Sequence, residues 1–347
     1  MKISIGTNIK DGPWGGGNLF AINLKEFLIS KGHDVINNLN DTDIDIILIT
    51  EPRKTSESSA FTHLDVKDYI NFVNKESLIV HRLNECDERK GTNFVNKYLI
   101  EANKVADYTV FVSTWLKNLY LDQGINTKNN NVILAGANEL VFNPKGKASF
   151  DKDEKLKFVT HHWGANWNKG FSIYQKIDDL LGNRDWKKKI EFTYIGNLPN
   201  KFKFKNCNYL EPLSGYQLAA ELKKNHVYLT GSLNEPSGNH HIEGAQCGLP
   251  VMYIDSGGVK EYCNKFGVEF TEENMEEKLN FVLKNYDEVS LKIKDYPFNS
   301  NVMSDNYLKL FDEMIRNKKS ILSQRNIEKP GIFEERLFNF KRMFNTK

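Results

Sequence analysis

Short apolar runs alternate with amphipathic stretches along the first half of the chain. Apolar runs at residues 2–6, 44–49 and 78–83 predict buried strands. Between the first two runs, apolar side chains recur every three or four residues from Asn18 to about Lys31, which predicts a helix that ends at Gly32. Further expected elements of this half are strands at 33–36, 108–112 and 132–134 and helices at 94–105 and 115–122.

The same alternation restarts after residues 143–155, a polar and charged stretch that we interpret as a linker between two domains. The expected strands are 156–160, 190–195, 227–230 and 251–254, and the expected helices are 171–181, 215–224 and 239–247. Short apolar strands that alternate with helices predict a parallel sheet with both faces covered. The predicted fold class is therefore α/β, with two doubly wound, Rossmann-like domains at residues 1–145 and 146–300.

Residues 301–347 are predicted to be helical and to pack back toward the N-terminal domain. Tyr307, Phe311 and Met314 belong to one apolar stripe of this region. Residues 331–347 alternate apolar and basic positions, which fits either a helix packed on the body or a basic amphipathic membrane contact. Alternating lysines and phenylalanines at 201–205 predict a solvated strand edge, with contact to a membrane or an anionic glycan as the alternative.

Composition narrows the class of protein. Lysine and arginine total 47 against 45 acidic residues, and this balance argues against nucleic acid as the main partner. The four cysteines have no CxxC spacing and are expected to be reduced thiols. The N-terminal segment predicts a strand rather than a signal peptide, and no apolar run approaches the ~18 residues of a membrane span. We therefore expect a cytoplasmic protein, with a peripheral contact at the inner membrane face left open.

The strongest chemical pattern is the segment 234–251, N-E-P-S-G-N-H-H-I-E-G-A-Q-C-G-L-P-V. Glu235 follows the predicted strand 227–230, so it is expected at the carboxyl edge of a parallel sheet, where open α/β folds bind ligands. Residues 237–239 then begin a helix whose free N–H groups suit an anion. Glu243 comes about one turn later, and its carboxylate can accept two hydrogen bonds from vicinal sugar hydroxyls.

This segment resembles the E-x7-E signature of the retaining GT-B glycosyltransferases known as the glycosyl transferases group 1 family. The run Gly248-Leu249-Pro250-Val251 and the later glycine pair at 257–258 with Glu261 fit the same family pattern. The glycines at 15–17 and the helix that ends at Gly32 look like the N-terminal glycine arrangement of that family. The resemblance covers roughly residues 1–285 and implies two Rossmann-like domains that face each other across a cleft.

Carried over residue by residue, the resemblance implies a catalytic role for Glu235, which would orient sugar hydroxyls. His81 lies where family members carry a histidine beside the transferred sugar, so it is the second expected catalytic residue. Glu243 would hold the ribose, and Lys169, from the pair Lys169-Gly170, would contact the donor diphosphate. The remaining donor-binding residues that we expect are Gly16, Gly17, Ser237, Gly238, Asn239 and His240.

The implied activity is retaining transfer of a sugar from a nucleoside-diphosphate sugar, with a UDP-sugar as the expected donor. The acceptor stays open between a glycan, a lipid-linked sugar and a small molecule. Neither a cofactor nor a metal ion is expected, because family members stabilise the leaving diphosphate with protein groups. In this picture the acceptor attacks the sugar from the same face from which the leaving group departs. The leaving phosphate takes the proton of the acceptor.

The chain departs from the family pattern about five residues before Lys169. Family members carry a G-R pair there, whereas this chain has Trp163-Gly164. His161, His162, Asn166 or Arg82 are candidate replacements for the arginine that clamps the diphosphate. The departure keeps two alternatives open, which are a catalytically silent nucleotide-sugar-binding partner subunit and another enzyme of the same fold, such as a nucleotide-sugar epimerase.

Overall fold

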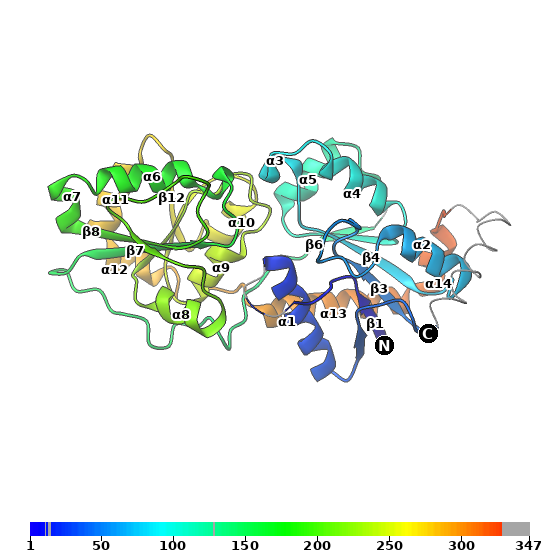
Figure 1. Cartoon of the computed structure of the whole chain (residues 1–347). Coiled ribbons are helices and arrows are strands. Elements are labelled where there is room, and N and C mark those ends of the chain that lie inside the picture. The colour runs from blue at the N-terminus through cyan, green and yellow to red at the C-terminus, as the bar shows by residue number, and fades with distance from the viewer. Residues whose placement is uncertain (11, 13–14, 128, 328–347) are drawn as a thin grey trace.

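The computed structural model describes residues 1–10, 12, 15–127 and 129–327, and these form two lobes, each built on a six-stranded sheet. Figure 1 shows the lobes side by side, with the chain passing between them near the middle of the molecule. Every strand pairing in both sheets is parallel. The predicted α/β class with two doubly wound domains is confirmed, while the boundaries at residues 145 and 300 stay predictions.

The N-terminal sheet has the strand order β2-β1-β3-β4-β5-β6. Its strands are β1 Lys2–Ile5, β2 Asp34–Ile36, β3 Ile46–Ile49, β4 Leu78–Leu83, β5 Tyr108–Phe111 and β6 Asn130–Val132. The helices around it are α1 Gly16–Ser30, α2 His63–Phe72, α3 Asp87–Lys90, α4 Val95–Asn103 and α5 Thr114–Asp122. The strand order reverses between β1 and β3, which makes this the topological switch point of the sheet. Ligands are therefore expected beyond the carboxyl ends of these two strands.

The C-terminal sheet has the strand order β12-β11-β10-β7-β8-β9. Its strands are β7 Leu156–His162, β8 Ile190–Gly196, β9 Asn208–Leu210, β10 Val227–Thr230, β11 Val251–Ile254 and β12 Gly267–Phe270. The helices are α6 Phe171–Leu180, α7 Arg184–Lys189, α8 Gly215–Lys223, α9 Asn239–Gln246, α10 Val259–Cys263, α11 Met275–Lys284 and α12 Tyr286–Leu291, with a short 3-10 turn, η1 Trp167–Lys169. In this sheet the strand order reverses between β7 and β10, and the carboxyl ends of these two strands face the other lobe.

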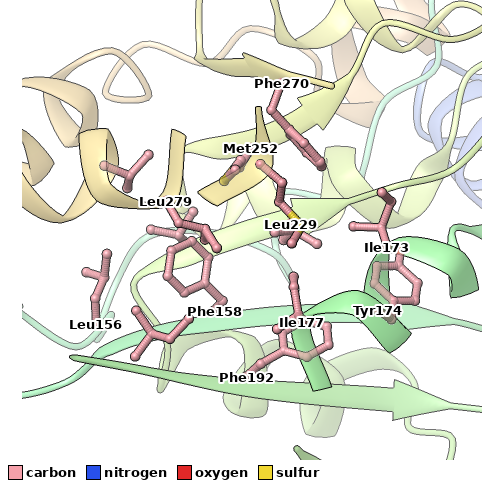
Figure 2. Packing of buried hydrophobic residues seen from close by; sticks show 14 of the residues in the cluster. Leu156, Phe158, Ile173, Tyr174, Ile177, Phe192, Leu229, Met252, Phe270 and Leu279 are labelled. Carbon is pink, nitrogen blue, oxygen red and sulfur yellow. The ribbon is translucent and has the colours of Figure 1, made fainter. Parts of the chain in front are cut away.

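Two hydrophobic cores cover opposite faces of the C-terminal sheet. Figure 2 shows one of them, in which Phe158 and Leu229 from the strands pack with Ile177 of α6 and Leu279 of α11. Burying a side chain of this size stabilises a fold by about 1.5–3 kcal/mol. Because apolar side chains fill both faces, the carboxyl ends of the strands are left to carry polar chemistry.

The predicted strand edge at residues 201–205 is wrong, because this segment is a loop. Phe202 and Phe204 are half-buried, and their rings contact each other at 4.9 Å between centroids while packing on the core. The carboxylate of Asp178 accepts backbone N–H bonds from Lys205, Asn206 and Cys207, which fixes the loop without a β-ladder. The lysines remain exposed, as a solvated segment requires.

The chain returns to the N-terminal lobe through α13 Ser300–Arg316, followed by α14 Lys318–Gln324. Tyr307 and Phe311 of α13 are buried in the N-terminal core, and the ring of Tyr307 lies 5.2 Å from that of Phe20 in α1. This return passes beside the outward connection, since Ala137 pairs with Asn299 and Ser300 N–H donates to the Ala137 carbonyl at 2.8 Å. Both covalent links between the lobes therefore run through one place.

Two expectations about membranes have different outcomes. The amphipathic segment 331–347 lies outside the described residues, so its role stays a prediction. Within the described part of the chain, every helix is too short or too polar to cross a bilayer.

Candidate functional site

A cleft of about 550 Å³ lies between the two lobes, at the carboxyl ends of both sheets. It is lined by loops that follow β1, β3 and β4 on one side and β7, β8 and β10 on the other. The residues of the predicted site that line it are Gly16, Gly17, Lys169, Glu235, Ser237, Gly238, Asn239, His240 and Glu243. The structure thus brings together residues that are far apart in the sequence.

The loop that carries Glu235 is braced by the glycine pair at 257–258. Glu235 pairs with Gly257 in a parallel bridge, and the Gly258 N–H donates to the Glu235 carbonyl at 2.8 Å. A Cβ atom on Gly257 would lie 2.4 Å from the Glu235 carbonyl oxygen, and Gly257 has a φ of 73°. Only glycine combines this close approach with a left-handed backbone, which explains the glycine pair in physical terms.

The Glu235 carboxylate is buried between two cations. Lys169 Nζ lies 2.6 Å from Oε2, and Arg89 Nε lies 3.4 Å from Oε1. Burial alone would raise the pKa of Glu235, but the charges of Lys169 and Arg89 outweigh it and lower the pKa to about 2. Glu235 is therefore an anion at any physiological pH, and it cannot serve as a proton donor.

Arg89 comes from the opposite lobe and was not found by the sequence analysis. It lies on α3, whose backbone is held against the C-terminal lobe because Asn168 Nδ2 donates to the Arg89 carbonyl at 3.0 Å and Asn234 Nδ2 to the Glu88 carbonyl at 3.3 Å. Burial alone would lower the pKa of Arg89, but Glu235 and Glu85 raise it. The first lobe thus supplies an arginine to the second, although α3 has no sequence signal that points to it.

Glu243 lies within α9 and faces the cleft from the C-terminal lobe. Its Oε2 is 2.8 Å from His161 Nε2, and the other ring nitrogen of His161 is 3.1 Å from the Tyr228 hydroxyl. The exposed fraction of Glu243 is 4% and that of His161 is 8%. These three hydrogen-bonded side chains hold the Glu243 carboxylate in one orientation, and a fixed carboxylate is suited to accept hydrogen bonds from a pair of hydroxyls.

The N-terminus of α9 opens into the cleft between Ser237 and Asn239. Gly238 at its cap has a φ of 76°, and a Cβ there would lie 2.4 Å from the His241 ring, so glycine is required. Two further imidazoles lie beneath this turn, with ring centroids of His162 and His240 4.4 Å apart. Burial lowers the pKa of both, so they are neutral hydrogen-bonding groups. The positive field at this turn therefore comes from the helix terminus and not from the imidazoles.

The first turn of α1 meets this terminus from the other lobe. A Cβ atom on Gly16 would lie 2.8 Å from the side chain of Asn239. Two helix N-termini from different domains therefore converge on the same part of the cleft, and Gly16 permits the approach because it has no side chain. This geometry agrees with the expectation that the glycines at 16–17 lie beside the other site residues.

His81 is the predicted site residue that the structure does not bring to this cleft. Its side chain is fully buried beneath β4, with Nδ1 2.9 Å from Asn103 Oδ1, and burial lowers its pKa to about 4. Side chains alternate along a strand, so the neighbouring residue, Arg82, lines the cleft instead. The catalytic role of His81 stays a prediction without support from this geometry.

Across residues 1–10, 12, 15–127 and 129–327, no group of three or more histidine, cysteine, aspartate or glutamate side chains is arranged to hold a metal ion. Independence from a metal remains a prediction.

Solved structures show what fold this arrangement belongs to, whereas no protein-family model and no curated protein matches the chain. A glycosyltransferase from Rickettsia africae is similar with a TM-score of 0.66 and 13% identity, over 91% of this chain and 98% of that chain. HepE from Anabaena, solved in complex with UDP, matches with a TM-score of 0.65 and 12% identity, over 90% and 100%. Sucrose-phosphate synthase from Thermosynechococcus elongatus matches with a TM-score of 0.61 and 13% identity, over 91% and 99%. The chain has the GT-B fold that we expected, and identities this low show the fold alone.

Proposed function

We propose that this protein is a glycosyltransferase that uses a nucleoside-diphosphate sugar, with a UDP-sugar as the expected donor. The observation that carries the proposal is the buried Glu235 carboxylate between Lys169 and Arg89, at the N-terminus of α9 and between the lobes. A fixed anion next to converging positive groups suits a ligand that has both hydroxyls and a diphosphate. Complexes of HepE with UDP and with UDP-glucose support this class of donor.

Each part of the donor has a matching group on the C-terminal lobe. Glu243, oriented by His161, accepts hydrogen bonds from the ribose. The diphosphate lies at the free N–H groups of α9, within reach of Lys169 and Arg89. The transferred sugar directs its hydroxyls to Glu235. In this arrangement Arg89 takes the place of the arginine that is missing before Lys169.

In the proposed reaction the bond between the anomeric carbon and the diphosphate oxygen breaks. The acceptor hydroxyl oxygen forms its bond to the same face of that carbon, and its proton passes to the leaving diphosphate oxygen. This path retains the anomeric configuration and requires no protein nucleophile. It fits Glu235, which two cations hold as a permanent anion, and the positive groups of the cleft stabilise the departing charge without a metal.

A second candidate function is a nucleotide-sugar-binding subunit without turnover. The specific observation that favours it is the 2.6 Å contact between Lys169 and Glu235, because a lysine already neutralised by a carboxylate is a weaker partner for a diphosphate. The two candidates make the same prediction for binding and opposite predictions for turnover in the isolated chain.

The test is a screen of UDP-, GDP- and ADP-sugars in the presence of a metal chelator, with thermal shift and nucleoside diphosphate release as readouts. We expect one donor base to raise the melting temperature and to be released slowly, and we expect Glu243→Gln to lose both effects. Glu277→Gln, in an exposed position on α11, is the matched control. Stabilisation without release, even with acceptor mixtures, would favour the silent subunit. No response to any nucleotide would overturn both candidates.

A further inference from the structure

Arg82 is a buried cation in the cleft that the proposed donor site does not use. It is the fifth residue of the buried strand β4, its exposed fraction is 4%, and it lines the cleft. Its guanidinium carbon lies 3.9 Å from the centre of the Phe20 ring, one turn into α1. The aromatic contact holds the guanidinium plane in place, and the Tyr307 hydroxyl is a hydrogen-bonding neighbour of this group. A guanidinium has five N–H donors, so the others are left for a further partner.

Arg82 differs from the other arginines of the cleft in its partners. Arg53 forms a two-pronged pair with Glu51, at 2.7 Å from Nε and 2.5 Å from Nη2. Arg89 faces Glu235 and Glu85. Among the described residues, by contrast, neither a hydrogen bond nor an ion pair links the Arg82 side chain to a carboxylate. A buried guanidinium without a carboxylate carries a large desolvation cost.

The electrostatic surroundings of Arg82 also separate it from the proposed diphosphate site. Burial lowers its pKa, and the neighbouring groups that oppose this shift are the hydroxyls of Tyr307 and Tyr262. The neighbours of Lys169 are instead Glu235, Arg89 and Glu85. The cleft therefore holds two cationic positions, one beside the donor-binding helix and one against the N-terminal lobe.

The first turn of α1 adds donors to the second position. Gly15 caps this 15-residue helix without a side-chain hydrogen bond from any described residue, and its first turn carries no acidic side chain there. The N–H groups of Gly16 and Gly17 precede the first intrahelical bonds and are free to bind a ligand. Space is open beside Gly17, because a Cβ there would meet no described atom within 4 Å, whereas Gly16 lies against Asn239. Arg82 and the first turn of α1 thus line the same cleft, in which the carboxylates of Glu51 and Glu85 already have cationic partners.

We infer that Arg82 and the first turn of α1 form an anion-binding subsite for the acceptor, which carries a phosphate or a carboxylate. The inference rests on the proposed function, because it assigns the acceptor to the lobe opposite the donor site. Bidentate contact from a guanidinium together with helix N–H groups suits both anions. A neutral acceptor would leave Arg82 unpaired in the cleft during the reaction.

Isothermal titration on the full chain tests this subsite. The protein is first saturated with UDP, and inorganic phosphate, glucose 6-phosphate, glucuronate and glucose are then titrated separately. We expect the three anions to bind and glucose to bind at least about tenfold more weakly. Arg82→Gln is expected to weaken the anions by about tenfold or more and to change the UDP affinity by less than about threefold. Arg53→Gln, which removes a cleft arginine that already has a partner, should leave phosphate binding within about threefold.

The outcomes separate the subsite from the donor site. If Arg82→Gln weakens UDP as strongly as it weakens phosphate, Arg82 belongs to the diphosphate site and the inference is overturned. Absence of anion binding to the UDP-loaded wild type overturns it as well. Stronger binding of UDP-glucuronate than UDP-glucose, lost in Arg82→Gln, would assign the anion to the donor sugar and also overturn the acceptor assignment. Failure of the wild type to bind UDP would instead refute the proposed function. If Arg82→Gln does not fold, Arg82→Lys is the second variant. It keeps the positive charge but loses the bidentate geometry of the guanidinium, and we expect it to bind phosphate with intermediate affinity.

Discussion

The two walls of the cleft differ in how their polar groups are satisfied. On the C-terminal wall, Glu243 has His161 and Glu235 has Lys169, with contacts of 2.8 and 2.6 Å. On the N-terminal wall, Arg82 has no carboxylate within the described chain, and α1 begins at glycines. The carboxylates of the first wall are already held by protein groups, whereas Arg82 and the first turn of α1 on the second wall present donors without an anionic partner among the described residues.

This difference indicates how each wall contributes to the free energy of ligand binding. A preorganised wall loses little on binding and discriminates by geometry, which suits a donor whose nucleotide part is constant. A wall with an unpaired cation gains most when a complementary anion arrives, which suits recognition of one acceptor class. Three sets of changes test this comparison, at the C-terminal wall, at a buried histidine of each lobe and at the contact between the walls, from the largest expected effect to the smallest.

The largest effect is expected from Lys169→Met on the C-terminal wall. The variant removes a cation next to the proposed leaving group, and loss of one such group lowers turnover by about 10²–10³-fold. The measurement is nucleoside diphosphate release at saturating donor, with circular dichroism to verify folding. Lys176→Met, on the exposed side of α6 where Lys176 contacts Glu272, controls for loss of a lysine. Turnover within about fivefold of wild type would show that this wall does not act through Lys169.

Acid is expected to destabilise both lobes below pH 6.5. Burial lowers the pKa of His81 to about 4 and that of His241 to about 3, so both are neutral when folded, whereas the unfolded chain takes up protons near pH 6.5. The free energy of unfolding is therefore highest above pH 6.5, where both histidines are neutral in the folded and the unfolded chain. It falls as the pH drops toward 4, by about 3 kcal/mol for each histidine.

Urea unfolding between pH 7 and 4 measures this loss. His81→Phe should flatten the pH dependence through the N-terminal lobe and His241→Phe through the C-terminal lobe. Equal slopes in wild type and both variants would mean that neither histidine is held neutral.

A smaller effect is expected from Gly16→Ala, which changes the contact between the walls. The new Cβ would lie 2.8 Å from the Asn239 side chain, so α1 and α9 must move apart, and this displaces the first turn of α9, whose N–H groups we propose bind the diphosphate. We expect UDP to bind about tenfold more weakly, or about 1.4 kcal/mol. Gly15→Ala is the matched control, because its Cβ has no described atom within 4 Å and its φ of −63° accepts alanine. Equal UDP affinities for the two variants would show that the convergence of helix ends is not needed for donor binding.

Much of the fold could be predicted because periodicity reports burial. The strands β4, β10 and β11 were predicted at their observed bounds, since each is a short, mostly apolar run. The four-residue helix α3 was missed because it has no buried side chain and is too short to show a helical period. Its position depends on Asn168 and Asn234 of the other lobe, and a contact across about 80 or more positions of the chain has no local signature.

The site residues could be predicted where the backbone fixes their position, and not where the facing of a side chain decides it. Glu235, Glu243 and Lys169 were placed together because a sheet edge and a helix start fix where their backbones lie. His81 and Arg82 are adjacent on β4, and the alternation of side chains decides that one faces the cleft and the other the opposite face. A strand buried at all six positions gives no polar pattern from which to choose between them.

The adjacency of the two lobe connections has a consequence for dividing this protein. Because α13 completes the core around Phe20 and α1, the N-terminal lobe consists of two separate pieces of the gene. A fragment that stops at the end of the C-terminal sheet would contain every strand of both lobes and still leave that core uncovered. The N-terminal lobe therefore cannot be produced as one continuous segment of the chain, whereas the strands of the C-terminal lobe all lie between its two connections.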